Sequence, residues 1–480
     1  MRVLYVSTEV HPALKTGGLA DVNAALPRAL EAAGADVRLL LPAFPALLAH
    51  ATEIGPPCPL GPALGAPSVT VLPCRLDGRA TWLIDAPRYY ARAGNPYVDA
   101  SGRDWPDNLE RFALLGWAAA RFADGGIGGW RPDIVHCHDW HAALCPAYLR
   151  ARGGDGPATV FTVHNLAYQG QFPGSRFSAL GLPGHFFAVH GLEFHGQVNF
   201  MKAGLFYADR ITTVSPSFAA EIQTPAAGFG LDGLLRARAD AVLGILNGVD
   251  TEAWNPRTDE NIAARFDADR IDGKTRCREA LEKACGLSAG SGPLLGVVSR
   301  LTPQKGLDLL RACLPQILAE GTRLVLLGSG DAGEEAAWRA AAESHPRSIM
   351  VHIGYDEALA HRIFAAADVI AVPSRFEPCG LTQMYAMLYG ALPLVRRTGG
   401  LADTVQDAGP ANLADGSATG FVFDAAEADD LLAALARLFA LWRDRAGWRR
   451  VQDTAMRRDF SWNRPAARYI ALYRELRPQA

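Results

Sequence analysis

Cysteine is scarce and dispersed in this chain, which excludes two classes of small domain. The 480 residues include eight cysteines, and no two of them form a Cys-x-x-Cys pair. A disulfide-stabilised secreted domain needs a much higher cysteine density, and a zinc ribbon needs paired cysteines. We therefore expect reduced thiols and a cytoplasmic protein.

Long apolar runs and a charge excess of one sign are also missing. No stretch of about 18 apolar residues occurs, and the run at 39–49 is interrupted by Pro42 and Pro45. The apolar run at 3–6 is too short for a secretory signal. Lys and Arg number 47 against 50 Asp and Glu, a net charge of -3, so the composition has no nucleic-acid footprint. We expect no membrane and no nucleic-acid partner.

Short apolar runs alternate with longer helical patterns, which predicts α/β structure. Runs of four or five apolar residues without polar alternation are typical of strands buried on both faces in parallel sheets. Segments such as 306–319 and 332–344 between them are long enough for crossover helices. Two doubly wound domains are predicted, with a boundary near 240–250 and a final helix at 462–476. The predicted strands lie in two sets, 3–6, 37–41, 134–137, 160–163 and 211–214, and 294–298, 324–327, 369–372 and 392–395.

The first predicted strand is followed by neither a Gly-x-Gly-x-x-Gly fingerprint nor a Walker loop. Lys15 stands there instead, followed by Gly17, Gly18 and Asp21 in a glycine turn. The six residues 16–21 recur identically at 398–403 after another predicted strand. A glycine turn that opens a helix offers backbone N–H groups to a phosphate. The alternative is an ordinary strand-to-helix turn, but the repeat and the adjacent lysine favour a ligand site.

Two further motifs follow predicted strands of the second set. Arg300 and Lys305 lie five residues apart after the strand at 294–298, where they could converge on one diphosphate or be solvated surface charges. Glu377 precedes Gly380 at the start of a predicted helix after the strand at 369–372. The N–H groups of residues 380–382 would point toward an anion. Glu377 either complements the helix dipole or binds a ligand hydroxyl, and we favour the hydroxyl.

Histidines cluster at 136–141, but their spacing matches no known zinc motif. Asp139 in this segment is predicted to bind sugar-like hydroxyls. His164 and Asn165 end another predicted strand, as part of a ligand site or of the packing. The Asp-x-Asp at 267–269 matches metal-dependent sugar transferases but lies in a polar segment far from any strand end, so no metal site is expected there. Together the motifs predict a diphosphate held by backbone and cations without a metal.

These motifs closely resemble those of the bacterial glycogen synthases, a family that includes the plant starch synthases. The resemblance spans essentially the whole chain in order. It rests on Lys-Thr-Gly-Gly-Leu-Ala-Asp (15–21), His-Asp-Trp-His (138–141), Thr-Val-His-Asn-Leu-Ala-Tyr-Gln-Gly (162–170), Asn-Gly-Val-Asp (247–250), Ser-Arg-Leu-Thr-Pro-Gln-Lys-Gly (299–306) and Pro-Ser-Arg-Phe-Glu-Pro-Cys-Gly-Leu-Thr-Gln (373–383).

The resemblance implies a GT-B fold, with two Rossmann-like domains facing across a deep cleft. Residues 1–243 would form the glucan-acceptor domain, 244–460 the nucleotide-sugar domain, and 461–480 a helix that packs back on the first domain. The implied reaction transfers glucose from ADP-glucose to the non-reducing-end 4-hydroxyl of an α-1,4-glucan such as glycogen. It retains the anomeric configuration and uses no metal and no cofactor.

The resemblance also implies residue roles. The catalytic set would be Glu377, Arg300, Lys305, His164 and Asp139, with the backbone carbonyl of His164 steadying charge at the anomeric carbon. Tyr355 would stack on the adenine. The other residues that would bind ADP-glucose are Lys15, Gly17, Gly18, Asp21, Tyr97, Asn165, Asn247, Cys379, Gly380, Leu381 and Thr382.

One position departs from the pattern of retaining relatives more widely. These carry a second Glu eight residues after the first, whereas position 385 here is Tyr, as is normal in glycogen and starch synthases. No carboxylate nucleophile is evident. Three other functions stay open: a UDP-glucose-dependent transferase, a non-catalytic glucan-binding or regulatory protein, and a dinucleotide oxidoreductase. The oxidoreductase is disfavoured because it lacks its fingerprint, and the non-catalytic protein because every charged site residue is present.

Overall fold

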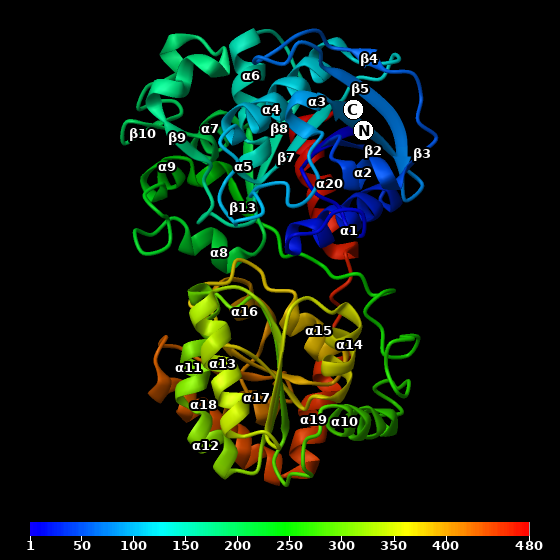
Figure 1. The fold of residues 1–480 in the computed structure, drawn as a ribbon, viewed down its shortest axis with the longest axis vertical. Coiled ribbons are helices and arrows are strands. Elements are labelled where there is room, and N and C mark those ends of the chain that lie inside the picture. The colour runs from blue at the N-terminus through cyan, green and yellow to red at the C-terminus, as the bar shows by residue number, and fades with distance from the viewer. Residues whose placement is uncertain (480) are drawn as a thin grey trace. The chain divides into compact units, whose positions relative to one another are not determined.

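The chain forms two compact units, each an α/β sheet covered by helices (Figure 1). The computed structural model describes residues 1–479. Unit 1 comprises Met1–Gly248 and residues 462–479, and unit 2 comprises Val249–Ser461. Every apolar run that was predicted as a strand lies in a strand to within one residue.

Unit 1 is built on a ten-stranded sheet in the order β13-β12-β8-β7-β1-β2-β6-β5-β3, with β4 paired to β5. The strands from β13 to β6 run parallel, and the edge formed by β3, β4 and β5 is antiparallel. The strands are β1 (Arg2–Val6), β2 (Asp36–Pro42), β3 (Ala51–Thr52), β4 (Cys58–Pro59), β5 (Thr70–Leu76), β6 (Arg79–Asp85), β7 (Ile134–His138), β8 (Ala158–Val163), β12 (Arg210–Thr213) and β13 (Val242–Gly244). A separate three-stranded sheet contains β9 (Gln171–Pro173), β10 (Glu193–Phe194) and β11 (Gln197–Asn199).

The first and last helices of the chain are neighbours in unit 1. These are α1 (Gly18–Ala32) and the C-terminal α20 (Asn463–Leu476), which lie side by side (Figure 1). Tyr473 of α20 also hydrogen-bonds through its hydroxyl to His136 Nδ1 of β7 at 2.7 Å. The remaining helices are α2 (Pro45–His50), α3 (Pro87–Tyr90), α4 (Asn108–Gly125), α5 (Asp139–Ala142), α6 (Leu144–Arg152), α7 (Phe200–Tyr207), α8 (Pro216–Glu221) and α9 (Asp232–Ala237).

Unit 2 has a six-stranded parallel sheet in the order β16-β15-β14-β17-β18-β19. Its strands are β14 (Leu294–Val298), β15 (Arg323–Gly328), β16 (Ile349–Ile353), β17 (Val369–Val372), β18 (Leu392–Arg396) and β19 (Phe421–Phe423). Its helices are α10 (Asp272–Ala284), α11 (Leu307–Ala312), α12 (Leu314–Ala319), α13 (Ala332–Ser344), α14 (Glu357–Ala366), α15 (Thr382–Leu388), α16 (Gly399–Thr404), α17 (Pro410–Asp415), α18 (Ala428–Arg443) and α19 (Arg445–Met456).

Two predicted elements differ from the structure. The single helix expected over 306–319 is divided into α11 and α12 around Cys313. Pro315 explains the division, because it lacks the N–H that a continuous helix would use there. The hairpin of β5 and β6 was not predicted, because Pro73 and Arg75 interrupt the apolar pattern of β5.

The connections change direction once within each sheet. In unit 1 the chain leaves β1 toward β2 on one side and leaves β7 toward β8 on the other. In unit 2 it leaves β14 toward β15 and leaves β17 toward β18 on the opposite side. Open α/β sheets bind ligands at the carboxyl ends of such a pair of strands. The segments after β1 and β7, and after β14 and β17, are therefore the favoured ligand-binding segments.

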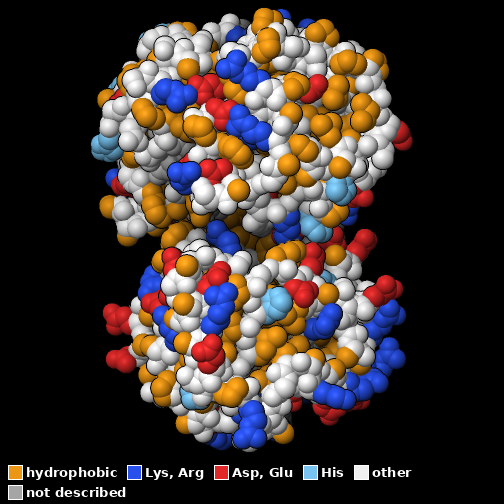
Figure 2. Space-filling model, viewed as in Figure 1, with side chains coloured by type: hydrophobic (Ala, Val, Ile, Leu, Met, Phe, Trp, Pro, Cys, Tyr) orange, Lys and Arg blue, Asp and Glu red, His pale blue; other side chains and the backbone are white. Residues whose placement is uncertain are grey.

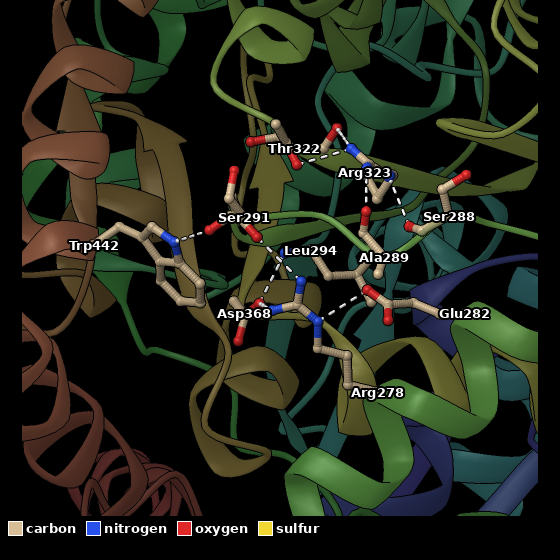
Figure 3. A network of polar contacts seen from close by, with 12 residues as sticks. Arg278, Glu282, Ser288, Ala289, Ser291, Leu294, Thr322, Arg323, Asp368 and Trp442 are labelled. Atoms are coloured by element: carbon tan, nitrogen blue, oxygen red, sulfur yellow. Dashed lines mark hydrogen bonds and ion pairs between the residues drawn. The ribbon is translucent and has the colours of Figure 1, made fainter.

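A half-buried ion pair lies at the opposite, amino ends of β14 and β17 (Figure 3). Asp368 accepts hydrogen bonds from Arg278 Nη1 at 2.6 Å and from the Leu294 N–H at 2.8 Å. Arg278 also donates to the Gly292 carbonyl at 3.1 Å.

Candidate active site

The loop after β1 is fixed by hydrogen bonds to a buried carboxylate. Glu9 is 2% exposed and accepts hydrogen bonds from the Thr16 N–H at 2.6 Å and from the Tyr97 hydroxyl at 3.1 Å. Burial raises the pKa of Glu9, and these hydrogen bonds oppose the rise. Gly17 precedes α1 in an extended conformation, and a Cβ placed on it would have no atom within 4 Å. The backbone of Gly17 is thus open to a ligand.

Two other predicted ligands lie near this loop. Lys15 forms an ion pair with Asp21 at 2.8 Å, with both side chains about a quarter exposed. Tyr97 stacks on His141, with ring centroids 4.5 Å apart, and shares a hydrogen bond of 2.8 Å with Thr8. The structure therefore brings Tyr97 to the carboxyl ends of both β1 and β7.

The ends of β7 and β8 meet through Asp139. Its Oδ1 accepts the backbone N–H of His164 at 2.7 Å and that of Asn165 at 3.4 Å. Asp139 has a φ of 54°, a left-handed conformation that is uncommon outside glycine and typical of strained functional positions. Burial raises the pKa of Asp139 from 3.8 to about 7, against the two N–H bonds that lower it. Three predicted residues thus form one cluster, in which Asp139 is buried and His164 and Asn165 are half-buried.

Two histidines near Asp139, His136 and His138, form side-chain hydrogen bonds. His136 uses both ring nitrogens, toward Tyr473 at 2.7 Å and toward Thr162 at 2.6 Å, and so has none left for a metal. Within residues 1–479, no group of three or more His, Cys, Asp or Glu side chains is arranged to hold a metal ion.

Asn247, another predicted ligand of ADP-glucose, is 5% exposed. Its Oδ1 is buried and has no hydrogen-bond partner in the described chain.

In unit 2 the segments after β14 and β17 meet through a charged pair. Lys305 Nζ lies 2.5 Å from Glu377 Oε2, and the buried Ser374 hydroxyl donates to the same oxygen at 2.9 Å. Glu377 is 6% exposed. Both contacts fall on Oε2, so Oε1 is the oxygen left for a ligand hydroxyl. Arg300 lies on the same loop as Lys305, with its side chain exposed.

The turn from Cys379 to Thr382 leads into α15. Gly380 has a φ of 70°, and the buried Gln383 amide donates to its carbonyl at 2.8 Å and to the Cys379 carbonyl at 3.1 Å. Leu381 is the residue that precedes the helix. The predicted phosphate-binding turn is therefore fixed by a side chain beneath it.

The repeated glycine pair supports this turn. A Cβ on Gly399 would lie 2.0 Å from the Glu377 carbonyl oxygen, and one on Gly400 would lie 2.1 Å from that of Cys379. The Gly400 N–H also donates to the Glu377 carbonyl at 3.1 Å. The glycines of the second copy therefore pack against residues 377–379 and support the turn beside Glu377.

A Gly-x-Gly-x-x-Gly sequence does occur in the chain, at 328–333 after β15, and the sequence interpretation overlooked it. Cβ atoms on Gly328 and Gly330 would lie 1.9 and 2.4 Å from the carbonyl oxygens of Ser299 and Leu301. The Gly330 N–H donates to Glu335, and the Gly333 N–H to Asp331. The N–H groups of Gly330 and Gly333 are thus already paired with carboxylates of the same segment, so the oxidoreductase stays disfavoured.

Two outlying predictions can be placed as well. Tyr355 follows β16 with 71% of its surface exposed, and its hydroxyl donates to Glu357 at 2.6 Å. Asp267 accepts the N–H groups of Asp269 and Arg270 at 3.0 and 2.8 Å, which is the geometry of a structural turn.

The residues that sequence reasoning missed are those that hold the predicted ones: Glu9, Ser374 and Gln383. Each is a polar residue beside a predicted motif, and all three are buried. Glu9 lies three residues after the first strand, and this position was a usable signal. Nothing in the sequence reveals which atoms Ser374 and Gln383 contact.

The surface carries both signs of charge on each unit, as Figure 2 shows for one face. This agrees with the small net charge of -3. Among the described helices, none combines the length and the hydropathy needed to span a membrane.

Comparison with known families identifies relatives over nearly the whole chain. Residues 2–237 match the starch synthase catalytic domain, and residues 292–440 match the glycosyl transferases group 1 family. Glycogen synthases of Yersinia pestis, Variovorax paradoxus and Francisella tularensis subsp. novicida are 54%, 53% and 50% identical. Each alignment covers 99% of this chain and at least 99% of the relative.

Solved structures give the same result. The catalytic domain of starch synthase IV from Arabidopsis thaliana, bound to ADP and acarbose, superimposes with a TM-score of 0.89 at 32% identity, over 99% of both chains. A sucrose-phosphate synthase from Thermosynechococcus elongatus, 18% identical with a TM-score of 0.62, shares the fold alone. The predicted GT-B fold is confirmed. The chain belongs to the glycogen synthase family of glycosyltransferases.

Proposed function

We propose that this protein transfers glucose from ADP-glucose to the non-reducing-end 4-hydroxyl of an α-1,4-glucan and releases ADP, in the cytoplasm. One observation carries the proposal. Lys305 Nζ lies 2.5 Å from Glu377 Oε2 at the carboxyl ends of β14 and β17, where the connections of the unit 2 sheet change direction. The chain that forms this pair is 50–54% identical to glycogen synthases over nearly its full length.

The leaving group determines what the cations do. Departure of ADP develops negative charge, and fixed cations stabilise such charge most effectively. We assign this role to Arg300 and Lys305, with the backbone of Gly380, Leu381 and Thr382 as further ligands. Lys15 and the open backbone at Gly17 would bind the same diphosphate. The diphosphate also accepts the proton of the attacking hydroxyl, which approaches on the face that ADP leaves, so configuration is retained.

The glucosyl unit needs ligands that are positioned before it binds. Ser374 and Lys305 hold Glu377 through Oε2, so we assign Oε1 to a sugar hydroxyl. Asp139 holds the backbone of His164 at 2.7 Å, which fixes the carbonyl that we assign to charge at the anomeric carbon. Tyr97, Asn165 and Asn247 complete the proposed sugar contacts.

We assign the base of the nucleotide to Tyr355. The related starch synthase IV structure contains ADP, and the exposed ring of Tyr355 is suited to stack on an adenine. A uracil could also stack on that ring, so a UDP-glucose-dependent enzyme is the second candidate.

Incubation of the purified protein with glycogen and radiolabelled ADP-glucose or UDP-glucose, with EDTA present, tests the proposal. Label that enters glycogen from ADP-glucose alone supports reaction, donor and metal independence together. Equal or better use of UDP-glucose overturns the donor. No incorporation from either donor, with glycogen still bound, indicates a non-catalytic glucan-binding protein. Glu377→Gln provides a matched sample in which transfer should be lost.

A further inference from the structure

His138 contacts a proposed catalytic residue but has no role in the mechanism above. It ends β7, next to Asp139, and its Nδ1 lies 2.9 Å from Nε2 of His164. Asp139 holds the backbone N–H of His164 at 2.7 Å. The adjacent residues 138 and 139 therefore hold His164 by its ring and by its backbone.

The ring of His138 cannot turn freely. The ring of Tyr5 stacks on it with centroids 4.0 Å apart, and the ring of His136 lies 4.1 Å away. His138 is 0% exposed. Its other nitrogen, Nε2, is buried and has no hydrogen-bond partner in the described chain.

Both rings of the pair are neutral, because burial lowers the pKa of His138 well below 6.5 and that of His164 to about 3. Each ring then carries one hydrogen, and two arrangements can make the bond. If His164 donated, the hydrogen of His138 would sit on Nε2 as a buried, unpaired donor. If His138 donates through Nδ1, its Nε2 is only an unpaired acceptor. Proteins leave buried acceptors unpaired more readily than buried N–H groups.

The second arrangement has a consequence for His164. With Nε2 accepting, its own hydrogen must be on Nδ1. His164 Nδ1 forms no hydrogen bond within residues 1–479. It is also not one of the buried unpaired atoms of these residues, whereas His138 Nε2 is. The residue is half-buried at the carboxyl end of β8. Its hydrogen is therefore available to a ligand.

We propose that His138 is a positioning residue that fixes His164 as the Nδ1–H tautomer, so that His164 donates this hydrogen to an oxygen of the glucosyl donor. The proposal rests on the proposed function for the identity of the ligand. The tautomer itself does not depend on activity.

The test combines ¹⁵N spectroscopy of the histidine-labelled full chain with kinetics of three variants. His138→Asn keeps a donor near the Nδ1 position, whereas His138→Phe keeps only the ring packing. Tyr473→Phe is the matched control, because it removes an equally buried hydrogen bond from the neighbouring His136. The His164 signals are assigned by their loss in His164→Asn.

We expect Nδ1–H at His164 in the wild type and in His138→Asn, and a shift toward Nε2–H in His138→Phe. Turnover should fall about tenfold or more in His138→Phe with little change in KM for glycogen, and should be largely restored in His138→Asn. Tyr473→Phe should lose stability without losing turnover.

Nε2–H at His164 in the wild type overturns the proposal. So does wild-type turnover in a folded His138→Phe, or equal losses in His138→Asn and His138→Phe. If His138→Phe fails to fold, the wild-type tautomer and the rate of His138→Asn decide. If the wild type transfers no glucose, the proposed function fails, and the spectra still decide whether His138 sets the tautomer.

Discussion

Replacing Asp139 with asparagine should stabilise unit 1 at about pH 8 and remove most of the glucosyl transfer. The carboxyl is 8% exposed, and burial raises its pKa from 3.8 to about 7. A carboxyl with a raised folded pKa destabilises the fold when it ionises, because the unfolded chain loses the same proton at lower pH. The protonated Asp139 carboxyl makes its full contribution to the free energy of unfolding below about pH 4. This contribution is lost as the pH rises through about 7.

The magnitude follows from the shift. A rise from 3.8 to about 7 corresponds to roughly 4 kcal/mol above pH 7, at about 1.4 kcal/mol per unit. Asparagine Oδ1 can still accept the N–H groups of His164 and Asn165, and asparagine tolerates positive φ better than most residues. Its new N–H groups need buried partners, so we expect a net gain of about 1–3 kcal/mol.

Scanning calorimetry of the wild type and Asp139→Asn at about pH 5 and about pH 8 measures this gain. The unit 1 transition should rise by about 2–4 °C per kcal/mol at the higher pH, and the gain should shrink at the lower pH, where the wild-type carboxyl is protonated. Transfer from ADP-glucose should fall about a hundredfold. A gain that is equal at both pH values, or a loss at the higher one, would refute the burial argument.

Asp133 is a control with the opposite sign. Burial raises its pKa, but hydrogen bonds and the charge of Arg2 outweigh this and hold the pKa below its ordinary value. Its ionised form therefore stabilises the fold above the unfolded pKa, and this contribution is lost as the pH falls through the folded pKa. Asp133→Asn should destabilise unit 1 at about pH 8, in the same calorimeter, without a large loss of transfer.

Four further substitutions test the unit 2 site and its support. Arg300→Ala or Lys305→Ala should lower kcat about tenfold or more, or about 1.4 kcal/mol per tenfold, while the surface variant Lys283→Ala turns over normally; near-normal rates in both site variants would remove the leaving-group assignment. Glu377→Gln should abolish transfer but leave ADP affinity, measured by calorimetric titration, largely intact; a large loss of affinity would mean that Glu377 shapes the phosphate site. Lys274→Met should cost about 2–4 kcal/mol in urea unfolding, because Lys274 Nζ donates to the carbonyls that end α14 and α15 at 3.3, 3.0 and 2.8 Å; an unchanged midpoint would contradict this.

The carboxyl ends of the strands could be predicted because two simple signals coincide there. An apolar run such as 294–298 identifies a buried strand, and a polar motif directly after it, such as Arg300 to Lys305, identifies the edge of the sheet. The order of the strands then decides which ends are neighbours. Runs of apolar residues contain no information about that order, so the meeting of Lys305 with Glu377 across β14 and β17 came only from the structure.

The supporting contacts could not be predicted because they join residues far apart in the sequence. Glu9 contacts Tyr97, which is 88 positions away, and His138 contacts His164, which is 26 positions away. Burial also changed the chemistry of single residues. Asp139 has an ordinary carboxyl in the sequence, but its pKa near 7 and its left-handed backbone arise from the packing around β7 and β8.

The two copies of Thr-Gly-Gly-Leu-Ala-Asp show the same limit and lead to a last prediction. Gly17 has an extended backbone, and a methyl added there would have no atom within 4 Å, so Gly17→Ala should leave the stability unchanged and weaken only the binding of ADP-glucose. A methyl on Gly400 would lie 2.1 Å from the Cys379 carbonyl oxygen, so Gly400→Ala must displace the turn beside Glu377. It should lose both thermal stability and turnover. Equal behaviour of the two variants, in thermal unfolding and in KM for ADP-glucose, would mean that the hexapeptide itself, and not its neighbours, decides what the glycines do.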